Sequence, residues 1–406
     1  MKIIVQKFGG TSVSSKEGRE MVASRIIERY KDGYNVVVVV SAMGRKGDPY
    51  ATDTLQDLVD RETVGDKEMD LLMSCGEIIS SVVIAGHLAE KGYEPAVLTG
   101  QQAGILTNDK FRDAQIIDIK PKNILKHLND NKIVIVPGFQ GYNQKGEVTT
   151  LGRGGSDISA VAIGKALNSN YVEIFTDVDG IMTADPTIVP NARVLEKMSY
   201  SEVYQLAEDG AKVIHPRAVD LARQFNIPIV IKNTFGDNKG TSIEGLTGSF
   251  IDNEKRLLNN RIITAITYKK GRVQISIPLD EVKDRESIDS LMHDIALHRI
   301  SLDLITFLVD HKIFTVGKDD KEKLMHILDA KGLEYKIVDN CCKISTIGYR
   351  MQGVPGVMTR IVRALSKENI KILQSSDSHN TIWCLIEEEN TNKALAALHE
   401  EFKLHM

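Results

Sequence analysis

An apolar strand that runs directly into two adjacent glycines constrains the start of this chain most strongly. Residues 3–5 are Ile, Ile and Val, and Lys7, Gly9 and Gly10 follow them. A serine at position 14 or 15 then offers a side-chain cap for a helix that we expect to reach about Tyr30. Glycine lets the backbone approach a ligand closely, and a helix start supplies free N–H groups for an anion. Residues 7–12, which we call the glycine corner, therefore favour an anion site. A tight turn beside a surface lysine is the alternative.

Length and composition indicate a globular chain of more than one domain. At 406 residues, with 42% hydrophobic and 26% charged residues, the chain exceeds one ordinary core, so we expect two or three domains. A net charge of −4 gives no general case for a nucleic-acid or membrane partner. We expect no membrane helix and no signal peptide. The cysteines lack a CxxC spacing, and adjacent Cys341 and Cys342 are expected on opposite faces of a strand, so we predict reduced thiols and a cytoplasmic location.

Strands and helices alternate along the first half of the chain. The Val-rich run Asn35–Ser41 is typical of a buried parallel strand. Further strands are expected at Pro95–Leu98, Lys132–Pro137, Tyr171–Thr176 and Ile229–Ile231, and helices at Thr54–Arg61, Asp66–Leu88 and Ile158–Leu167. This alternation predicts an α/β fold in which helices cover both faces of a mostly parallel sheet and ligands bind beyond the carboxyl ends of its strands. The glycine-containing loops at 41–44 and 138–141 follow such strand ends.

The pattern changes after residues 240–260, whose short polar residues and glycines are typical of a linker. Beyond it, segments Ser287–Phe307 and Thr359–Ser376 align at an offset of 70 residues, so that Leu291 superposes on Ile361 and Ile300 on Ile370. Each unit is expected to run strand, helix, strand, strand, helix, which predicts two tandem α+β modules. Two copies favour a regulatory or pairing role over catalysis.

A second glycine motif covers residues 152–157 and precedes an expected helix. Gly154 and Gly155 would expose backbone donors to an anion, and the Arg153 guanidinium fits a carboxylate. Asp157 stands at the helix start, where it caps the helix or organises neighbouring lysines. Both interpretations of Asp157 stay open at this point.

Three further stretches carry candidate ligand groups. Asp177 and Asp179 lack the remaining ligands of a calcium loop, so the glycine turn around them favours a nucleotide over a metal. Lys212 follows another glycine turn and adds a second cation. Glu77 is placed at the entry to an apolar helix, where capping alone is the alternative to contact with a ligand.

Together these motifs resemble the aspartate kinases (aspartokinases), members of the amino acid kinase family with tandem C-terminal ACT domains. The resemblance runs along essentially the whole chain and rests on Val5–Val13, Ser41–Gly44, Gly76–Glu77, Arg153–Asp157, Thr176–Gly180 and Gly210–Lys212. It looks closest to the Gram-positive branch that responds to diaminopimelate. It implies a catalytic amino acid kinase fold at 1–246, a linker at 247–260, and ACT domains at 261–338 and 339–406, with an exchange of strands between the two left open.

The resemblance implies transfer of the ATP γ-phosphoryl group to the side-chain carboxylate of L-aspartate, which gives 4-phospho-L-aspartate. This is the first step of lysine, diaminopimelate, threonine and methionine biosynthesis. Two anions must meet in such a reaction, and the implied catalytic residues Lys7, Lys212 and Asp157 would supply cations and hold them in place. Mg²⁺ is expected to be held mainly by phosphates and water, so no protein ligand is named.

The family's binding positions transfer to this sequence residue by residue. ATP would contact Lys7, Phe8, Gly9, Gly10, Ser41, Thr176, Asp177, Gly180, Met182, Lys212 and Val213. Aspartate would contact Thr52, Glu77, Arg153, Gly154, Gly155 and Ser156. The sequence departs from the family at Met182 and Thr187, where other members carry a tyrosine and an arginine, and in a longer loop at 45–51.

The ACT modules imply feedback control by an amino acid, with diaminopimelate, lysine and threonine as candidates. The expected effector residues are Met351, Gly353, Val354, Pro355, Gly356, Gln374, Ser375 and Ser376, since a glycine turn before a helix offers amides to a carboxylate. Dimerisation alone is the other role for the modules, and we expect a homodimer formed through them. Another amino-acid-type kinase and a non-catalytic amino-acid sensor of the same fold are the alternative functions.

Overall fold

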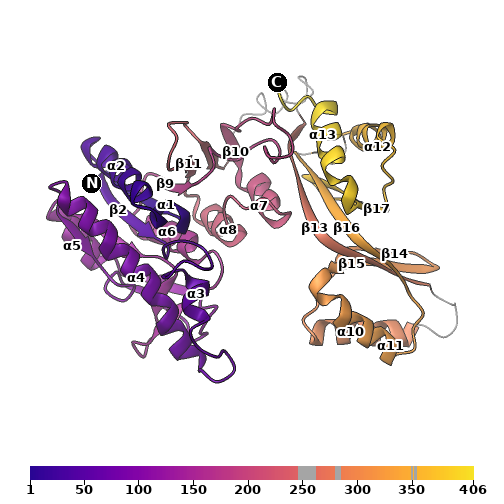
Figure 1. Ribbon diagram of the computed structural model, residues 1–406, viewed down its shortest axis with the longest axis horizontal. Coiled ribbons are helices and arrows are strands. Elements are labelled where there is room, and N and C mark those ends of the chain that lie inside the picture. The colour runs from indigo at the N-terminus through magenta and orange to yellow at the C-terminus, as the bar shows by residue number, and fades with distance from the viewer. Residues whose placement is uncertain (246–261, 279–284, 349–350, 352–353) are drawn as a thin grey trace. The chain divides into compact units, whose positions relative to one another are not determined.

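The computed structural model describes residues 1–245, 262–278, 285–348, 351 and 354–406, with only the backbone described at 285–289. It divides into two compact units, which Figure 1 traces along the chain. Residues 1–181, 194–207 and 212–247 form unit 1, and residues 182–193, 208–211 and 248–406 form unit 2. The predicted linker at 247–260 lies outside the described residues, so the predicted domain limits remain predictions.

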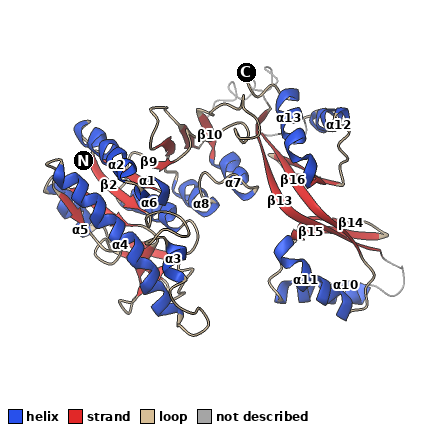
Figure 2. Ribbon diagram, in the orientation of Figure 1, coloured by secondary structure: helices blue, strands red, loops and turns tan. Residues whose placement is uncertain are grey.

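An eight-stranded sheet forms the centre of unit 1 (Figure 2). Its order is β10 (Lys197–Ser199), β12 (Thr241–Glu244), β11 (Ile229–Asn233), β9 (Val172–Thr176), β1 (Ile3–Phe8), β2 (Asn35–Val40), β6 (Ile133–Pro137) and β3 (Pro95–Val97). Val5 pairs with Val37 on one side and with Val172 on the other. Every pairing is parallel except that of β11 with β12, which confirms the predicted α/β sheet.

Helices cover both faces of this sheet, as the alternation of elements predicts. On one face, α2 (Lys16–Lys31) and α4 (Asp66–Glu90) bury Ile26, Ile84 and Leu88 against apolar residues of β1, β2 and β6. On the other, α6 (Gly155–Ala166) approaches so closely that a Cβ on Gly164 would lie 2.7 Å from the Val172 side chain. In the described residues α4 is long and apolar enough to cross a membrane, but a core helix meets the same criterion and α4 packs as one.

The remaining elements of unit 1 surround the sheet. They are the helices α1 (Gly10–Ser14), α3 (Thr52–Gln56), α5 (Lys122–Asn129), α7 (Tyr200–Glu208) and α8 (Pro216–Phe225), and a small sheet in the order β5 (Ile116–Ile119), β4 (Ile105–Thr107), β7 (Gln140–Tyr142), β8 (Val148–Thr150). Ser15 caps α2 as predicted, because its side chain accepts a hydrogen bond from Gly18 N–H. The short helix α1 was not predicted, since the glycine at its first position lowers helix propensity.

Unit 2 is built on a six-stranded antiparallel sheet. Its order is β14 (Asp303–Phe307), β15 (His311–Gly317), β13 (Ile263–Pro278), β16 (Lys336–Gly348), β18 (Thr381–Glu387) and β17 (Gln374–Asp377). The helices are α10 (Arg285–Leu297), α11 (Lys321–Ala330), α12 (Val357–Lys367) and α13 (Thr391–Glu401), with short 3₁₀ turns at Lys318–Asp320 and Glu388–Asn390. The long strands β13 and β16 run between the pair of helices α12 and α13 and the pair α10 and α11 (Figure 2).

The predicted internal repeat is confirmed by these elements. β15, its 3₁₀ turn and the start of α11 recur as β18, its turn and the start of α13 at the predicted offset of 70 residues. The two repeats share one sheet, because β13 and β16 pair along most of their length. Cys341 and Cys342 pack in different apolar clusters on opposite faces of β16, and both are free thiols, as predicted.

Candidate active site

A buried ion pair joins the glycine corner after β1 to the first turn of α6. Lys7 Nζ lies 2.7 Å from Asp157 Oδ1, and each side chain is 12% exposed. Asp157 Oδ2 also accepts a hydrogen bond of 3.3 Å from the backbone N–H of His215. Gly154, at φ 74°, is the N-cap of α6 and no side chain caps the helix, so the capping interpretation of Asp157 is wrong. Asp157 is therefore free to orient Lys7, the role that the sequence left open.

Gly9 and Gly10, the two glycines after β1, have different neighbours. A Cβ on Gly9 would lie 3.7 Å from Lys7 Nζ, an ordinary contact distance, so a small side chain at this position would touch the lysine without a clash. A Cβ on Gly10 would lie 2.6 Å from the Ala42 carbonyl oxygen, and Gly44 N–H donates to the Gly10 carbonyl at 3.0 Å. Gly10 thus lets the loop after β2 pack against the corner, which is a close approach of protein to protein.

The turn at 176–180 lies next to this corner, because β9 pairs with β1. Phe8 and Phe175 stack with ring centroids 4.7 Å apart, and Gly9 N–H donates to the Phe175 carbonyl. Asp177 forms an exposed ion pair of 3.0 Å with Arg45, and Asp179 accepts a 2.7 Å hydrogen bond from Asn233. Across the described residues no group of three or more acidic, His or Cys side chains could hold a metal ion.

Thr234 is a buried residue that no sequence motif singles out. Its hydroxyl lies 2.7 Å from that of Ser12 and donates to the Thr176 carbonyl at 3.1 Å. It therefore ties the glycine corner to the end of β9. A threonine directly after a strand is common in any sheet, so only the three-dimensional contact identifies it.

Glu77 lies in the interior of α4 and not at its entry, so the predicted capping alternative is wrong. The side chain is 2% exposed, and Oε1 accepts a hydrogen bond from Ala42 N–H at 3.2 Å. Within the described part of the chain, no donor reaches Oε2. Burial raises the pKa of Glu77 to about 8, against hydrogen bonds from Ala42 N–H and the Thr52 side chain that favour the ionised form. A buried carboxylate oxygen without a partner is suited to a cationic ligand group.

The structure places only some of the other residues predicted to contact aspartate or ATP next to one another. Ser41 N–H donates to the Phe8 carbonyl, which holds the loop after β2 against the corner. Gly155 and Ser156 are buried in the first turn of α6, whereas Arg153 and Lys212 are exposed. Among the ion pairs of the described residues, Asp157 is paired with Lys7 and not with Lys212. Met182 belongs to unit 2, so its relation to the other predicted ATP contacts is not described.

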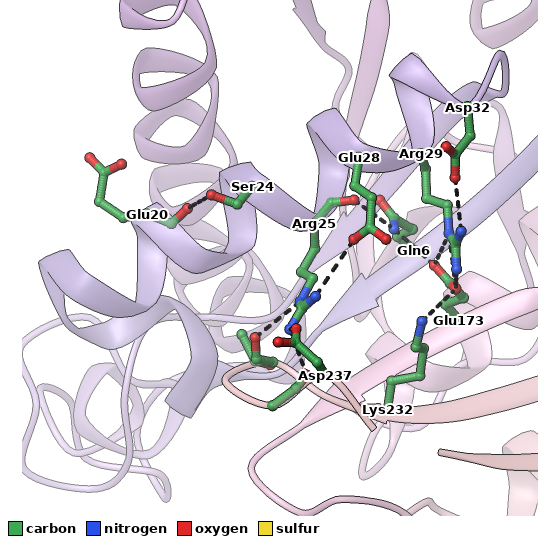
Figure 3. Close-up of polar contacts among 12 residues, drawn as sticks. Gln6, Glu20, Ser24, Arg25, Glu28, Arg29, Asp32, Glu173, Lys232 and Asp237 are labelled. Atoms are coloured by element: carbon green, nitrogen blue, oxygen red, sulfur yellow. Dashed lines mark hydrogen bonds and ion pairs between the residues drawn. The ribbon is translucent and has the colours of Figure 1, made fainter. Parts of the chain in front are cut away.

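A second charged cluster in unit 1 has a structural role (Figure 3). Glu173 on β9 is 1% exposed and lies 2.7 Å from Arg29 Nη2 of α2, and it also accepts a 2.9 Å hydrogen bond from Gln6 Nε2. Lys232 Nζ approaches the same carboxylate at 3.5 Å. Hydrogen bonding to Glu173 raises the pKa of Arg29 further above its already high value. Because Gln6 and Lys7 are neighbours on β1, their side chains point to opposite faces of the sheet, and this cluster lies on the face away from Lys7.

The predicted effector residues that the structure describes lie on different elements of unit 2. Met351 is buried, and its N–H donates to the His379 carbonyl. Gly356, at φ 91°, is the N-cap of α12. Gln374 instead bonds with Gln274, Thr306 and the Leu304 carbonyl. Gly353 lies outside the described residues, and no hydrogen bond among the others joins Gly356 to Gln374.

Comparison with known proteins shows which class of protein carries this parallel sheet and its paired lysine, namely the amino-acid-type kinases. Residues 2–233 match the model of the amino acid kinase family, and residues 336–400 match an ACT domain. The chain is 45% identical over 406 residues to aspartokinase 1 of Bacillus subtilis (strain 168), with 100% of both covered. It is 36% identical over 413 residues to the aspartokinase of Helicobacter pylori, with 99% of both covered.

Solved structures show the same fold. Clostridium acetobutylicum aspartate kinase matches with a TM-score of 0.78 at 22% identity, covering 98% of this chain and 100% of that one. E. coli aspartokinase III, solved with aspartate and ADP, matches with a TM-score of 0.75 at 23% identity, covering 98% and 99%. The chain belongs to the aspartokinase family. It is a kinase that phosphorylates the side-chain carboxylate of aspartate with ATP, and it carries the ACT domains of an allosterically regulated enzyme.

Proposed function

We propose that phosphoryl transfer takes place at the carboxyl ends of β1, β2 and β9, with Lys7 and Lys212 as the cations beside the transferred group. The ion pair of 2.7 Å between Lys7 and Asp157 carries this proposal. A cation that is already oriented lowers the electrostatic cost of bringing a triphosphate to a carboxylate. Asp157 needs no role as a base, because the aspartate carboxylate carries no proton at neutral pH.

ATP is proposed to lie along the glycine corner and the turn at 176–180, at the predicted positions of unit 1. Mg²⁺ would enter with the nucleotide and neutralise phosphate charge. The two carboxylates of the turn at 176–180 already have partners, since Asp177 pairs with Arg45 and Asp179 accepts a hydrogen bond from Asn233. This supports the expectation that phosphates and water, rather than side chains, hold the ion.

Aspartate is proposed to bind between α4 and the start of α6. The unpartnered Oε2 of Glu77 would accept from the substrate ammonium group, and exposed Arg153 would bind the α-carboxylate. Thr52 lies near Glu77, since its side chain contributes to the Glu77 pKa. Gly154, Gly155 and Ser156 would supply backbone donors at the start of α6.

The site is tested with Lys7→Ala and Asp157→Ala in an aspartate-dependent ADP-release assay. We expect kcat to fall by on the order of 10³-fold or more for Lys7→Ala and about 10²-fold for Asp157→Ala. Glu173→Gln is the matched control, because it breaks a buried ion pair of the same sheet on the opposite face. Activity of Lys7→Ala equal to that of the control would overturn the proposal.

Feedback control is proposed to act through the second ACT module, with Gly356 offering amides to the carboxylate of an amino acid and β17 taking its ammonium end. Diaminopimelate, lysine and threonine are tested singly as inhibitors of ADP release. Inhibition by one of them that is lost in Gln374→Ala supports the site. Inhibition by all three that is unchanged in this variant contradicts it.

We also propose a cytoplasmic homodimer formed through the ACT modules. Edge strand β14 and its turn expose apolar side chains, among them Phe307 at 54% and Val309 at 86%. An exposed apolar edge strand is a surface that a second copy would cover. Light scattering measures the mass of the wild type and of Phe307→Lys in solution. We expect a dimer for the wild type and a weakened dimer for the variant, and a monomeric wild type would contradict the proposal.

A further inference from the structure

Residues 208–211 connect α7 to Lys212 and pack within unit 2. Their backbone lies directly on β13. A Cβ on Gly210, at φ 118°, would lie 2.3 Å from the Tyr268 carbonyl oxygen, and Lys269 Nζ donates to the Glu208 carbonyl at 3.4 Å. Only a glycine allows this approach, because any side chain at Gly210 would collide with the strand.

Asp209 anchors the same segment through both of its carboxylate oxygens. Oδ1 lies 2.9 Å from Lys343 Nζ of β16, and Oδ2 accepts a 2.8 Å hydrogen bond from Trp383 Nε1 of β18. The side chains of Asp209 and Lys343 are 3% and 6% exposed. Lys343 also contacts Asp303 Oδ2 at 2.7 Å. A charge pair this deeply buried resists separation, since pulling Asp209 away would leave an uncompensated charge in the interior.

Only Gly210 and Ala211 separate this anchor from Lys212, where the chain returns to unit 1. The three steps along the backbone from Asp209 to Lys212 span at most about 11 Å when extended, so the position of Asp209 limits where the backbone of Lys212 can lie. The exposed Lys212 side chain has no ion pair of its own among the described residues. Its placement therefore depends on the backbone that carries it.

We propose that Asp209 is a positioning residue for Lys212, and that the regulatory sheet holds this lysine in place through the Lys343 and Trp383 contacts. The proposal rests on the proposed role of Lys212 in phosphoryl transfer. By linkage, a ligand that shifts β16 or β18 changes the placement of Lys212, and nucleotide bound at Lys212 changes the environment of Trp383. The regulatory unit would thus act on the reaction through a segment of four residues.

The test compares Asp209→Asn with Asp303→Asn, a matched control. Both variants remove one carboxylate from Lys343, but Asp303 lies on β14 and not in the segment that leads to Lys212. We expect Asp209→Asn to lower kcat by about 10–100-fold with the KM for aspartate changed by less than about twofold, because misplacement by about 1 Å is enough for such a loss. Asp303→Asn should keep kcat within about twofold at a comparable loss in Tm.

Trp383 is the only tryptophan in the sequence, so its fluorescence reports on this anchor directly. A non-hydrolysable ATP analogue should change its emission in the wild type and in Asp303→Asn, and not in Asp209→Asn. If Asp209→Asn does not fold, Trp383→Phe replaces it in the kinetic comparison, since it removes one of the two anchoring contacts. Equal kcat in the anchor variant and in Asp303→Asn overturns the positioning role.

Lys212→Ala separates the failure of this inference from that of the proposed function. An active Lys212→Ala enzyme would refute the proposed role of Lys212 itself. An inactive one, combined with equal kcat in the anchor and control variants, would refute the positioning role of Asp209 alone.

Discussion

The hydroxyl groups of Ser12 and Thr234 lie 2.7 Å apart in the core of unit 1, although 222 positions separate them in the chain. Ser12 belongs to the glycine corner, and Thr234 follows β11 and also bonds the Thr176 carbonyl. This contact fixes two loops of the proposed nucleotide site against each other. The geometry of the glycine corner thus depends on a strand two places away in the sheet.

Thr234→Val is expected to lower the free energy of unfolding by about 1–3 kcal/mol, because it leaves the Ser12 hydroxyl buried without a partner. The KM for ATP should rise as the Thr176 end of β9 loosens. Urea unfolding and steady-state kinetics measure the two effects. Ser12→Ala/Thr234→Val should cost little more than the single change. A double variant whose loss equals the sum of both single losses would contradict the coupling.

The raised pKa of Glu77, about 8, gives the free enzyme a specific dependence on pH. The folded state holds this proton more tightly than the unfolded chain, where an ordinary glutamate titrates near 4.3. The contribution to stability is therefore complete below about pH 4 and is lost as the pH rises toward 8. Urea unfolding across this range should show a difference between wild type and Glu77→Gln that varies with pH, and a constant difference would contradict the shift.

The affinity for aspartate should change with pH in the opposite direction to the stability of the free enzyme, because both depend on the titration of Glu77. The proposed ammonium contact needs the carboxylate, so apparent affinity should increase as the pH rises from 6 toward 8, and binding should release a proton. Glu77→Gln should raise the KM for aspartate by about 10–100-fold and remove this dependence. Calorimetry in buffers of different ionisation enthalpy counts the protons. Equal proton release by wild type and variant would contradict the assignment.

Gly154→Ala should damage the site, whereas Gly33→Ala should cost only local strain. Both glycines have positive φ, 74° and 81°. A Cβ on Gly154 would lie 2.2 Å from His215 Cγ, while nothing lies within 4 Å of one on Gly33. Gly33→Ala should cost about 1–2 kcal/mol and leave kcat unchanged. Gly154→Ala should cost more and lower kcat, because displacing His215 disturbs its contact with Asp157. Thermal unfolding and ADP release compare the two.

Glu173→Gln should lower the free energy of unfolding by about 3 kcal/mol, since it leaves Arg29 without its buried partner. Asp237→Asn serves as the exposed control, because the Asp237 side chain is 95% exposed and its ion pair with Arg25 is well hydrated. No measurable change is expected there. Urea unfolding at neutral pH distinguishes the two, and similar losses would show that the Glu173 cluster contributes no more than a surface pair.

Much of the fold is predictable because its signals are local. The Val-rich run became β2, Ser15 caps α2, and the repeat at an offset of 70 residues matches the elements of unit 2. Periodicity, caps and glycine turns depend on a few neighbouring residues. The glycine loops that the sequence predicts after β1, β2 and β6 do follow the ends of these strands.

The errors arise where a neighbouring element decides what a residue does. Glu77 resembles a helix cap in its local sequence, yet α4 begins at Asp66 and buries Glu77 against the loop after β2. Gly10 remains a proposed nucleotide contact, but its local sequence did not show that the backbone of Ala42 and Gly44 also packs beside it.

Local sequence patterns were enough to predict the alternating fold, the tandem modules, the family and the candidate residues at the strand ends. The folded chain was needed to show that Asp157 pairs with Lys7, that Thr234 holds Ser12, and that Asp209 is anchored by Lys343 and Trp383. Local patterns set which segments form strands and helices. Charge pairing and burial depend on residues brought together from far apart in the chain, so they are properties of the packed molecule.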